Sequence, residues 1–325
     1  MKKDVQSEKV RAVSFGWDPS RRRDFCKRLK VQKCLLVVLA LYMIYVGIFS
    51  YYPMYGTVLA FKDFSIRKGI LGSPWADPWY KWFEYFFTSP DFGTIMTNTL
   101  AMSFLKIFIG FPVPIFFALL LNEIRNSRFK RVVQSVSYLP HFISWVVITG
   151  LVNSMLSSSG IVNQILMTLG FIKEPILFLG EADMFWGIIT VLGIWKEMGW
   201  SSIIYLSAIT SLDPEMYESA MLDGAGRIRQ TFSLTIPCIM PTIVMLFIMQ
   251  LGYILSVGFE QQLFLQNPMN YSKSEVIDTY VFKVGLQKMD FSYSTAVGLF
   301  KSVTGFTLVL LTNKVAKRYL HMSLF

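Results

Sequence analysis

Residues 94–121, TIMTNTLAMSFLKIFIGFPVPIFFALLL, form a long apolar stretch in which Lys106 is the single charged residue. A helix needs about 20 consecutive, mostly apolar residues to cross the hydrocarbon core of a bilayer. This stretch meets that condition, and the same rule finds further candidates. We therefore predict an all-α, polytopic membrane protein with six transmembrane helices, listed in chain order: 34–53, 94–121, 133–156, 184–210, 236–259 and 293–313.

The composition also favours a membrane location. Of the 325 residues, 53% are hydrophobic and 16% are charged, and the mean hydropathy is +0.46. A soluble domain normally carries about a quarter charged residues. The net charge of +10 would suit a nucleic-acid partner, but eleven of the 31 Lys and Arg lie in residues 1–33, directly before the first apolar stretch. Basic residues there meet lipid headgroups, so we expect a multi-pass protein of the cell membrane that binds no nucleic acid.

The distribution of cations predicts which segments face the cytoplasm, where Lys and Arg concentrate. Three segments are rich in them: 1–33, 122–131 and 314–325. The connection 157–183 contains only Lys173, as expected outside the cell. The chain therefore divides into a basic cytoplasmic tail, a transmembrane domain and a second cytoplasmic tail, at 1–33, 34–313 and 314–325. With both termini inside, the connection 211–235 is cytoplasmic.

That connection contains the most informative sequence, DPEMYESAMLDGAGRIRQTFSLTIP at residues 213–237. Asp213 followed by Pro214 favours a helix start, with a capping side chain and then a residue whose missing N–H costs nothing there. Four positions at helical spacing form a small, mostly apolar face: Tyr217, Ala220, Met221 and Gly224. We predict a short helix under the membrane, while an ordinary solvated loop stays open as the alternative on these residues alone.

The same residues resemble the EAA loop of ABC importer permeases, whose pattern is Glu-Ala-Ala, three residues, Gly, nine residues, Ile, one residue and Leu-Pro. The matching residues are Glu218, Ala220, Gly224 and Pro237, with Asp223 in the usual Asp-Gly-Ala core. The departures are Ser219, Leu234 and Ile236, which keep size or hydrophobicity. The resemblance implies the type I ABC importer permease fold. It also implies that this segment is a coupling helix that docks on a separate ATP-hydrolysing subunit.

In that family, Glu218 would be the polar anchor of the docked helix and Gly224 its hinge. The full set of coupling residues implied by the resemblance is Tyr217, Glu218, Ala220, Met221, Asp223, Gly224 and Pro237. Two further segments, WKEMGW at 195–200 and YSTAVGLF at 293–300, resemble the carbohydrate branch that handles alginate, pectin or xylan fragments. This branch implies an oligosaccharide substrate, including acidic, uronate-containing ones.

The resemblance also implies partners: a second homologous permease in a heterodimer, dimeric ABC ATPase subunits and an external solute-binding protein. The loop 260–292 is a candidate contact for the last of these, or a capping segment. No Walker-type glycine loop occurs in the sequence, so we expect no enzymatic activity and no cofactor on this chain, with ATP bound by the partner. Two histidines and no Cys/His cluster give no case for a metal site.

Polar side chains inside spans are costly and usually face a cavity or a partner. The candidates for a substrate pathway are Asn153, Lys196, Glu197, Gln250 and Lys301. Asn98 and Lys106 also lie inside predicted spans. Hydrogen bonds between helices are the alternative for the amides, and helix packing is the alternative for Lys106. We hypothesise that the cationic Lys196 and Lys301 suit the path to an acidic sugar.

Two other classes of protein remain as alternatives. An ion-coupled secondary carrier of a small polar solute often has paired broken helices in its two halves. Pro112 and Pro114 interrupt one span, but the other half has no equivalent. A membrane enzyme needs a cluster of catalytic side chains near one interface, and none is visible.

Overall fold

The computed structural model describes residues 32–319, so almost all of the expected tail 1–33 and the last six residues of the tail 314–325 lie outside this range. The chain divides into two units, Met1–Thr57 and Val58–Phe325, which are considered separately. The first unit contains the start of a helix that runs over Lys33–Phe61. This helix comprises α2 (Lys33–Val46), the π-helical η1 (Gly47–Tyr51), α3 (Tyr52–Met54) and the 3₁₀-helical η2 (Tyr55–Phe61).

Within the described residues, four helices are long and apolar enough to span a membrane: Lys33–Phe61, Phe92–Glu123, Arg227–Gly252 and Phe291–Arg318. The pair Ser127–Phe142 and Trp145–Met155 adds a fifth candidate if it is counted as one bent span. The helix α11 (Phe185–Thr210) has 26 residues, about 39 Å at 1.5 Å per residue, which is long enough to cross, but Lys196 and Glu197 make its centre polar. The prediction of a helical protein with several membrane-spanning helices is confirmed.

The second unit contains the remaining elements. Its first half comprises α4 (Gly69–Gly72), α5 (Lys81–Thr88), α6 (Phe92–Leu105), η3 (Lys106–Gly110), α7 (Pro112–Glu123), α8 (Ser127–Tyr138), η4 (Leu139–Phe142), α9 (Trp145–Met155) and α10 (Ile161–Thr168). Its second half comprises η5 (Ala182–Met184), α11, α12 (Pro214–Leu222), α13 (Arg227–Gln230), η6 (Thr231–Thr235), α14 (Ile236–Gly252), α15 (Phe259–Leu265), α16 (Tyr271–Ser274), α17 (Ile277–Phe282), η7 (Lys283–Gln287) and α18 (Phe291–Tyr319). In the described part, the β structure amounts to one isolated bridge between Lys62 and Trp75.

Two predicted spans differ from the structure. Residues 133–156 do not form one continuous helix, because α8 and α9 meet at a bend of 99°. Pro140 lies in the short turn η4, and the Ser144 side chain accepts a hydrogen bond from the Val147 backbone N–H, which starts a new helix. The span predicted at 236–259 ends at Gly252. The apolar residues beyond it are buried in the protein core rather than exposed to lipid, as Leu255 and Val257 show.

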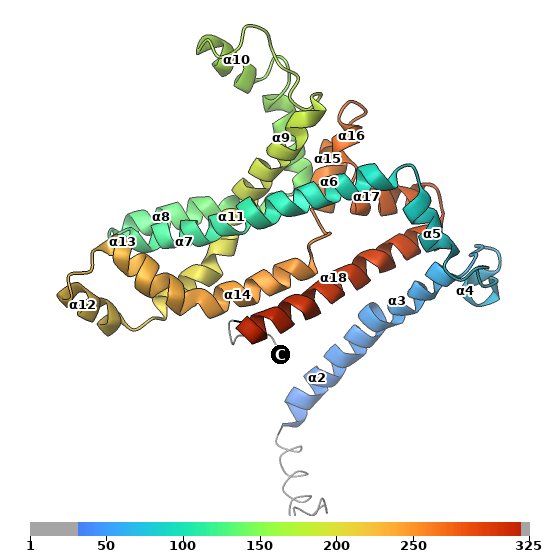
Figure 1. Cartoon of the computed structure of the whole chain (residues 1–325), viewed down its shortest axis with the longest axis horizontal. Coiled ribbons are helices and arrows are strands. Elements are labelled where there is room, and N and C mark those ends of the chain that lie inside the picture. Colours follow the sequence, from blue (N-terminus) through green and yellow to red (C-terminus); the bar gives the residue numbers. More distant parts are fainter. Residues whose placement is uncertain (1–31, 320–325) are drawn as a thin grey trace, which may run out of the picture. The chain divides into compact units, whose positions relative to one another are not determined.

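The helices of the second unit pack around α11 and around a pair formed by α14 and α18. The two helices of this pair lie side by side (Figure 1). Near the α12 end, one core cluster joins α7, α11 and α14 through Ala118, Leu119, Leu121, Tyr205, Leu206, Ile209 and Ile239. The helix α12 lies at one end of this unit, and α10 projects away from the other helices beyond α9 (Figure 1).

Candidate functional site

The segment between α11 and α14 forms the short helix that the sequence predicts. The Asp213 side chain accepts a hydrogen bond from the Glu215 backbone N–H at 3.0 Å, and Pro214 occupies the first turn. The helix ends before Gly224, whose φ is +76°, a conformation that favours glycine. The Ala225 N–H then bonds back to the Ala220 carbonyl at 2.9 Å. Local chemistry thus fixes both ends of α12.

α12 makes few contacts with the rest of the chain. The hydroxyls of Tyr217 and Thr235 are 3.0 Å apart and tie the middle of α12 to η6. Leu222 is 90% exposed and Met221 is 58% exposed. The remaining coupling candidates divide by exposure: Glu218, Asp223, Gly224 and Pro237 are exposed, and Tyr217 and Ala220 are half-buried. A defined helix with an exposed apolar end is suited to docking on another protein.

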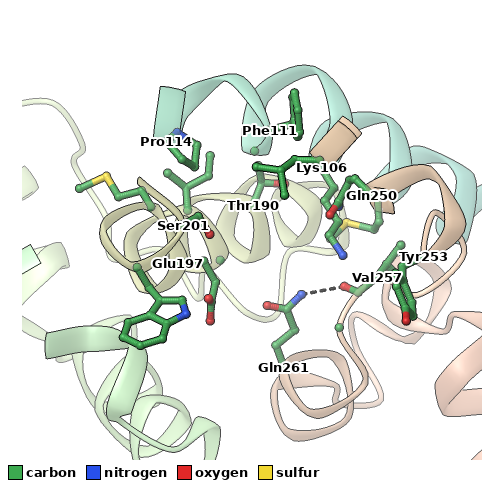
Figure 2. Close-up of a pocket in the computed structure, with 18 of the residues that line it drawn as sticks. Lys106, Phe111, Pro114, Thr190, Glu197, Ser201, Gln250, Tyr253, Val257 and Gln261 are labelled. Atoms are coloured by element: carbon green, nitrogen blue, oxygen red, sulfur yellow. Dashed lines mark hydrogen bonds between the residues drawn. The ribbon is translucent and has the colours of Figure 1, made fainter. Parts of the chain in front are cut away.

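A cavity of about 810 Å³ lies between α6–α7, α11, α14 and the segment that follows α14. Figure 2 shows its labelled side chains around one space. Apolar residues form most of the wall, and the polar side chains among them include Lys106, Thr190, Glu197, Ser201, Tyr205, Gln250, Tyr253 and Gln261. This volume lies in the range of sites that bind small molecules, about 300–1,000 Å³.

Two side chains of the cavity hold the irregular segment 253–258 in place. The Lys106 ammonium donates to the Ser256 carbonyl at 2.9 Å, and the Gln261 amide donates to the Val257 carbonyl at 2.7 Å (Figure 2, dashed line for the second). Gly258 adopts a φ of +99° just before α15. One wall of the cavity is therefore made by backbone whose polar groups are satisfied by cavity side chains.

The bend between α8 and α9 is held by residues 195–200 of α11. The Lys196 ammonium donates to the carbonyls of Pro140, His141 and Ile143, at 3.2, 2.6 and 2.7 Å. Glu197 pairs with His141 Nδ1 at 2.9 Å. We name residues 139–144, together with the α11 residues that contact them, the helix joint.

Ring and backbone packing complete the joint. The His141 ring stacks on Trp200, with centroids 4.6 Å apart and planes 2° apart. Gly199 lies so close to the last turn of α8 that a Cβ atom on this glycine would be 2.1 Å from the Ser137 carbonyl oxygen. The motif at 195–200 therefore has a clear structural role at the joint.

The predicted pathway residues fall in different places. Glu197 and Gln250 line the cavity together with Lys106. Lys196 is 6% exposed and lies in the joint, not in the cavity wall. Lys301 pairs with Asp278 and lines a second cavity of about 730 Å³ between α14 and α18. Asn153 is exposed on α9 and lines neither cavity.

The segment 260–292 packs closely onto α6, which the sequence did not reveal. The buried Asn98 amide of α6 donates to the carbonyls of Ser272 and Glu275, at 3.0 and 2.9 Å. The Glu275 carboxylate is buried and accepts from Lys283 at 2.6 Å. Burial raises the pKa of the Tyr271 hydroxyl to about 12, and the Glu275 carboxylate adds to this shift. A polar network thus makes the segment a folded cap.

Comparison with known proteins identifies the family to which this architecture belongs. Residues 110–321 match the family described as binding-protein-dependent transport system inner membrane component. The chain is 43% identical, over 316 residues and 97% of both chains, to the polygalacturonan/rhamnogalacturonan transport system permease protein YteP of Bacillus subtilis (strain 168). It is 41% identical over 308 residues to protein LplB of the same organism, covering 91% of this chain and 92% of that one.

A solved structure has the same fold. A chain from a bacterial ABC transporter involved in the import of the acidic polysaccharide alginate superposes with a TM-score of 0.82 and 39% identity, covering 91% of this chain and 99% of that one. This match and the family assignment argue against the ion-coupled carrier and the membrane enzyme. The chain belongs to the binding-protein-dependent transport system inner membrane components, the permeases of ABC importers, and is a multi-pass protein of the cell membrane.

Proposed function

We propose that this chain forms half of the membrane path of an ATP-driven importer for oligosaccharides released from acidic polysaccharides. The relatives named above support the substrate class, since one is named for polygalacturonan and rhamnogalacturonan and another for alginate. The cavity is of a size and composition typical of small-molecule sites, with a few polar side chains in a largely apolar wall.

Coupling to ATP hydrolysis is assigned to the segment 213–237. The observation that carries this assignment is the exposed, capped helix α12, whose apolar end has no partner within the described residues. An exposed apolar helix end gains stability when another protein covers it. In the proposed cycle, ATP closes two ATPase subunits, α12 transmits this movement, and the spans alternate between outward-open and inward-open states.

The remaining partners follow from the same proposal. A second, related permease supplies the other half of the path, and an external solute-binding protein delivers the sugar. A structure of the alginate transporter in complex with an alginate pentasaccharide-bound periplasmic protein supports the last partner. The folded cap 260–292 lies at the end of this unit away from α12 and is the proposed contact for the binding protein (Figure 1).

The test is a charge reversal on α12. Glu218→Lys places a cation at the proposed docking surface, and we expect uptake to fall by about tenfold or more while the protein still folds and inserts. The ATPase rate measured in the assembled transporter should no longer respond to sugar. Glu174→Lys is the matched control, because it makes the same charge change on an exposed residue outside the segment 213–237. Normal uptake by the Glu218 variant would refute the assignment.

A further inference from the structure

The main cavity contains one positively charged side chain and one carboxylate. Among the lining residues in the described part of the chain, Lys106 is the single Lys or Arg, and Glu197 is the single acid. Their surroundings differ. Glu197 already has a partner, His141, whose ring is held by Trp200. The anionic group of the cavity is therefore engaged within the chain.

Lys106 is less engaged. An ammonium group has three N–H donors. Within residues 32–319, the hydrogen bond of Lys106 is to the Ser256 carbonyl, and no carboxylate lies within ion-pair distance of it. Its side chain is partly exposed. Two donors of a cation therefore remain available at the wall of the cavity (Figure 2).

The backbone geometry also changes at Lys106. Lys106 begins a five-residue π-helical turn, η3, that interrupts the long helix from Phe92 to Glu123. Such turns occur frequently at functional sites. The described residues contain three more, η1, η6 and η7, and η3 is the one that lines the main cavity. Pro112 follows at the start of α7. The interruption lies beside the cavity, so a change in side-chain direction there changes which groups face the cavity.

Comparison with the other two lysines in spans sharpens the contrast. Lys196 donates to three carbonyls in the joint, and Lys301 pairs with Asp278 at the second cavity. Both cations are satisfied by their own chain. The hypothesis that these two lysines select an acidic sugar therefore has less support than a role for Lys106.

We propose that Lys106 is the specificity-determining residue of this half of the path and binds the carboxylate of a uronic acid unit. This inference rests on the proposed function. An ammonium group and a carboxylate form a charge-assisted hydrogen bond, which is about twice as strong as a neutral one. The amides of Gln250 and Gln261 line the same cavity and supply neutral donors and acceptors for hydroxyl groups.

The experiment compares two sugars in the assembled transporter with its partner permease, ATPase and binding protein. One is an oligogalacturonate, and the other is the same oligomer partly methyl-esterified, which lowers its charge but keeps its length and linkage. Three variants are made: Lys106→Met, Lys106→Gln and Lys106→Arg. Lys301→Met combined with Asp278→Asn is the control, because it removes a lysine from a span together with its ion-pair partner, and neither residue lines the main cavity.

We expect the Met and Gln variants to lose uptake of the acid form by on the order of tenfold to a hundredfold and to lose much less of the ester. Arg should keep most uptake of the acid. Gln distinguishes the roles, because its amide can still donate to the Ser256 carbonyl: a purely structural role predicts that Gln rescues the acid form. Rescue by Gln, or equal loss for both sugars, overturns the proposal for Lys106. Wild-type protein that carries neither sugar overturns the proposed function itself.

Discussion

The helix joint and α12 differ in how far the rest of the chain covers and bonds their side chains. In the joint, the buried Lys196 ammonium has three carbonyl partners within the same chain. On α12, Leu222 is 90% exposed, so the described chain covers little of its side chain. A charge that is buried and fully bonded indicates a structural role, whereas neighbouring apolar side chains that stay exposed on an ordered helix suit a docking surface. The position of a residue in a span does not by itself distinguish these cases.

Lys196→Met tests the joint most severely. The substitution removes the donor shared by three carbonyls, of which the Pro140 carbonyl still accepts from the Ile143 N–H, so two carbonyls lose their partner. Each unsatisfied group costs about 1–3 kcal/mol, so we expect a loss on the order of 2 kcal/mol or more. Thermal unfolding in detergent, followed by tryptophan fluorescence, measures it. Lys106→Met is the matched comparison, because that residue has one carbonyl partner instead of three. An unchanged unfolding temperature for Lys196→Met would remove the structural role of this lysine.

Gly199→Ala probes the same joint through packing. Its Cβ atom would lie 2.1 Å from the Ser137 carbonyl oxygen, so the backbone must shift. Overpacking of this kind typically costs about 1–3 kcal/mol. Gly193→Ala on the same helix is the control, because its Cβ would be an ordinary 3.6 Å from the Gln261 side chain. We expect lower yield of folded protein for Gly199→Ala alone, measured by size-exclusion chromatography. Equal yields for the two variants would show that α8 and α11 are free to separate.

The sequence predicts α12 well because its determinants are local. Asp213 caps a backbone N–H two residues away, and Gly224 ends the helix through its own φ. Periodicity and family spacing identify such a segment without knowledge of the fold. The long apolar spans are predictable for a similar reason, since length and composition alone decide them.

The joint and the cavity could not be predicted in this way. Lys196 lies 53 to 56 residues from the carbonyls that it bonds, and Lys106 lies 150 residues from Ser256. Hydropathy places Lys106, Lys196 and Lys301 alike in predicted spans. Only the packed structure shows that Lys196 is fully hydrogen-bonded, whereas Lys106 has donors left for a ligand. The predicted span 236–259 was too long for a related reason. Residues 253–258 are mostly apolar, and burial in a protein core and exposure to lipid both require apolar side chains.

The smallest expected effect concerns the turn that follows α12. Gly224 has a φ of +76°, and a residue with a Cβ atom pays about 1–2 kcal/mol to adopt the left-handed conformation. Gly226, two residues later, has a φ of −68° and open space around its Cβ position. If this turn sets the angle at which α12 meets the ATPase, Gly224→Ala should reduce sugar-stimulated ATP hydrolysis and uptake by roughly fivefold, since 1 kcal/mol corresponds to about that factor. Gly226→Ala should leave both rates unchanged. Equal rates for the two variants would mean that α12 docks through its side chains alone, whatever the geometry of the turn behind it.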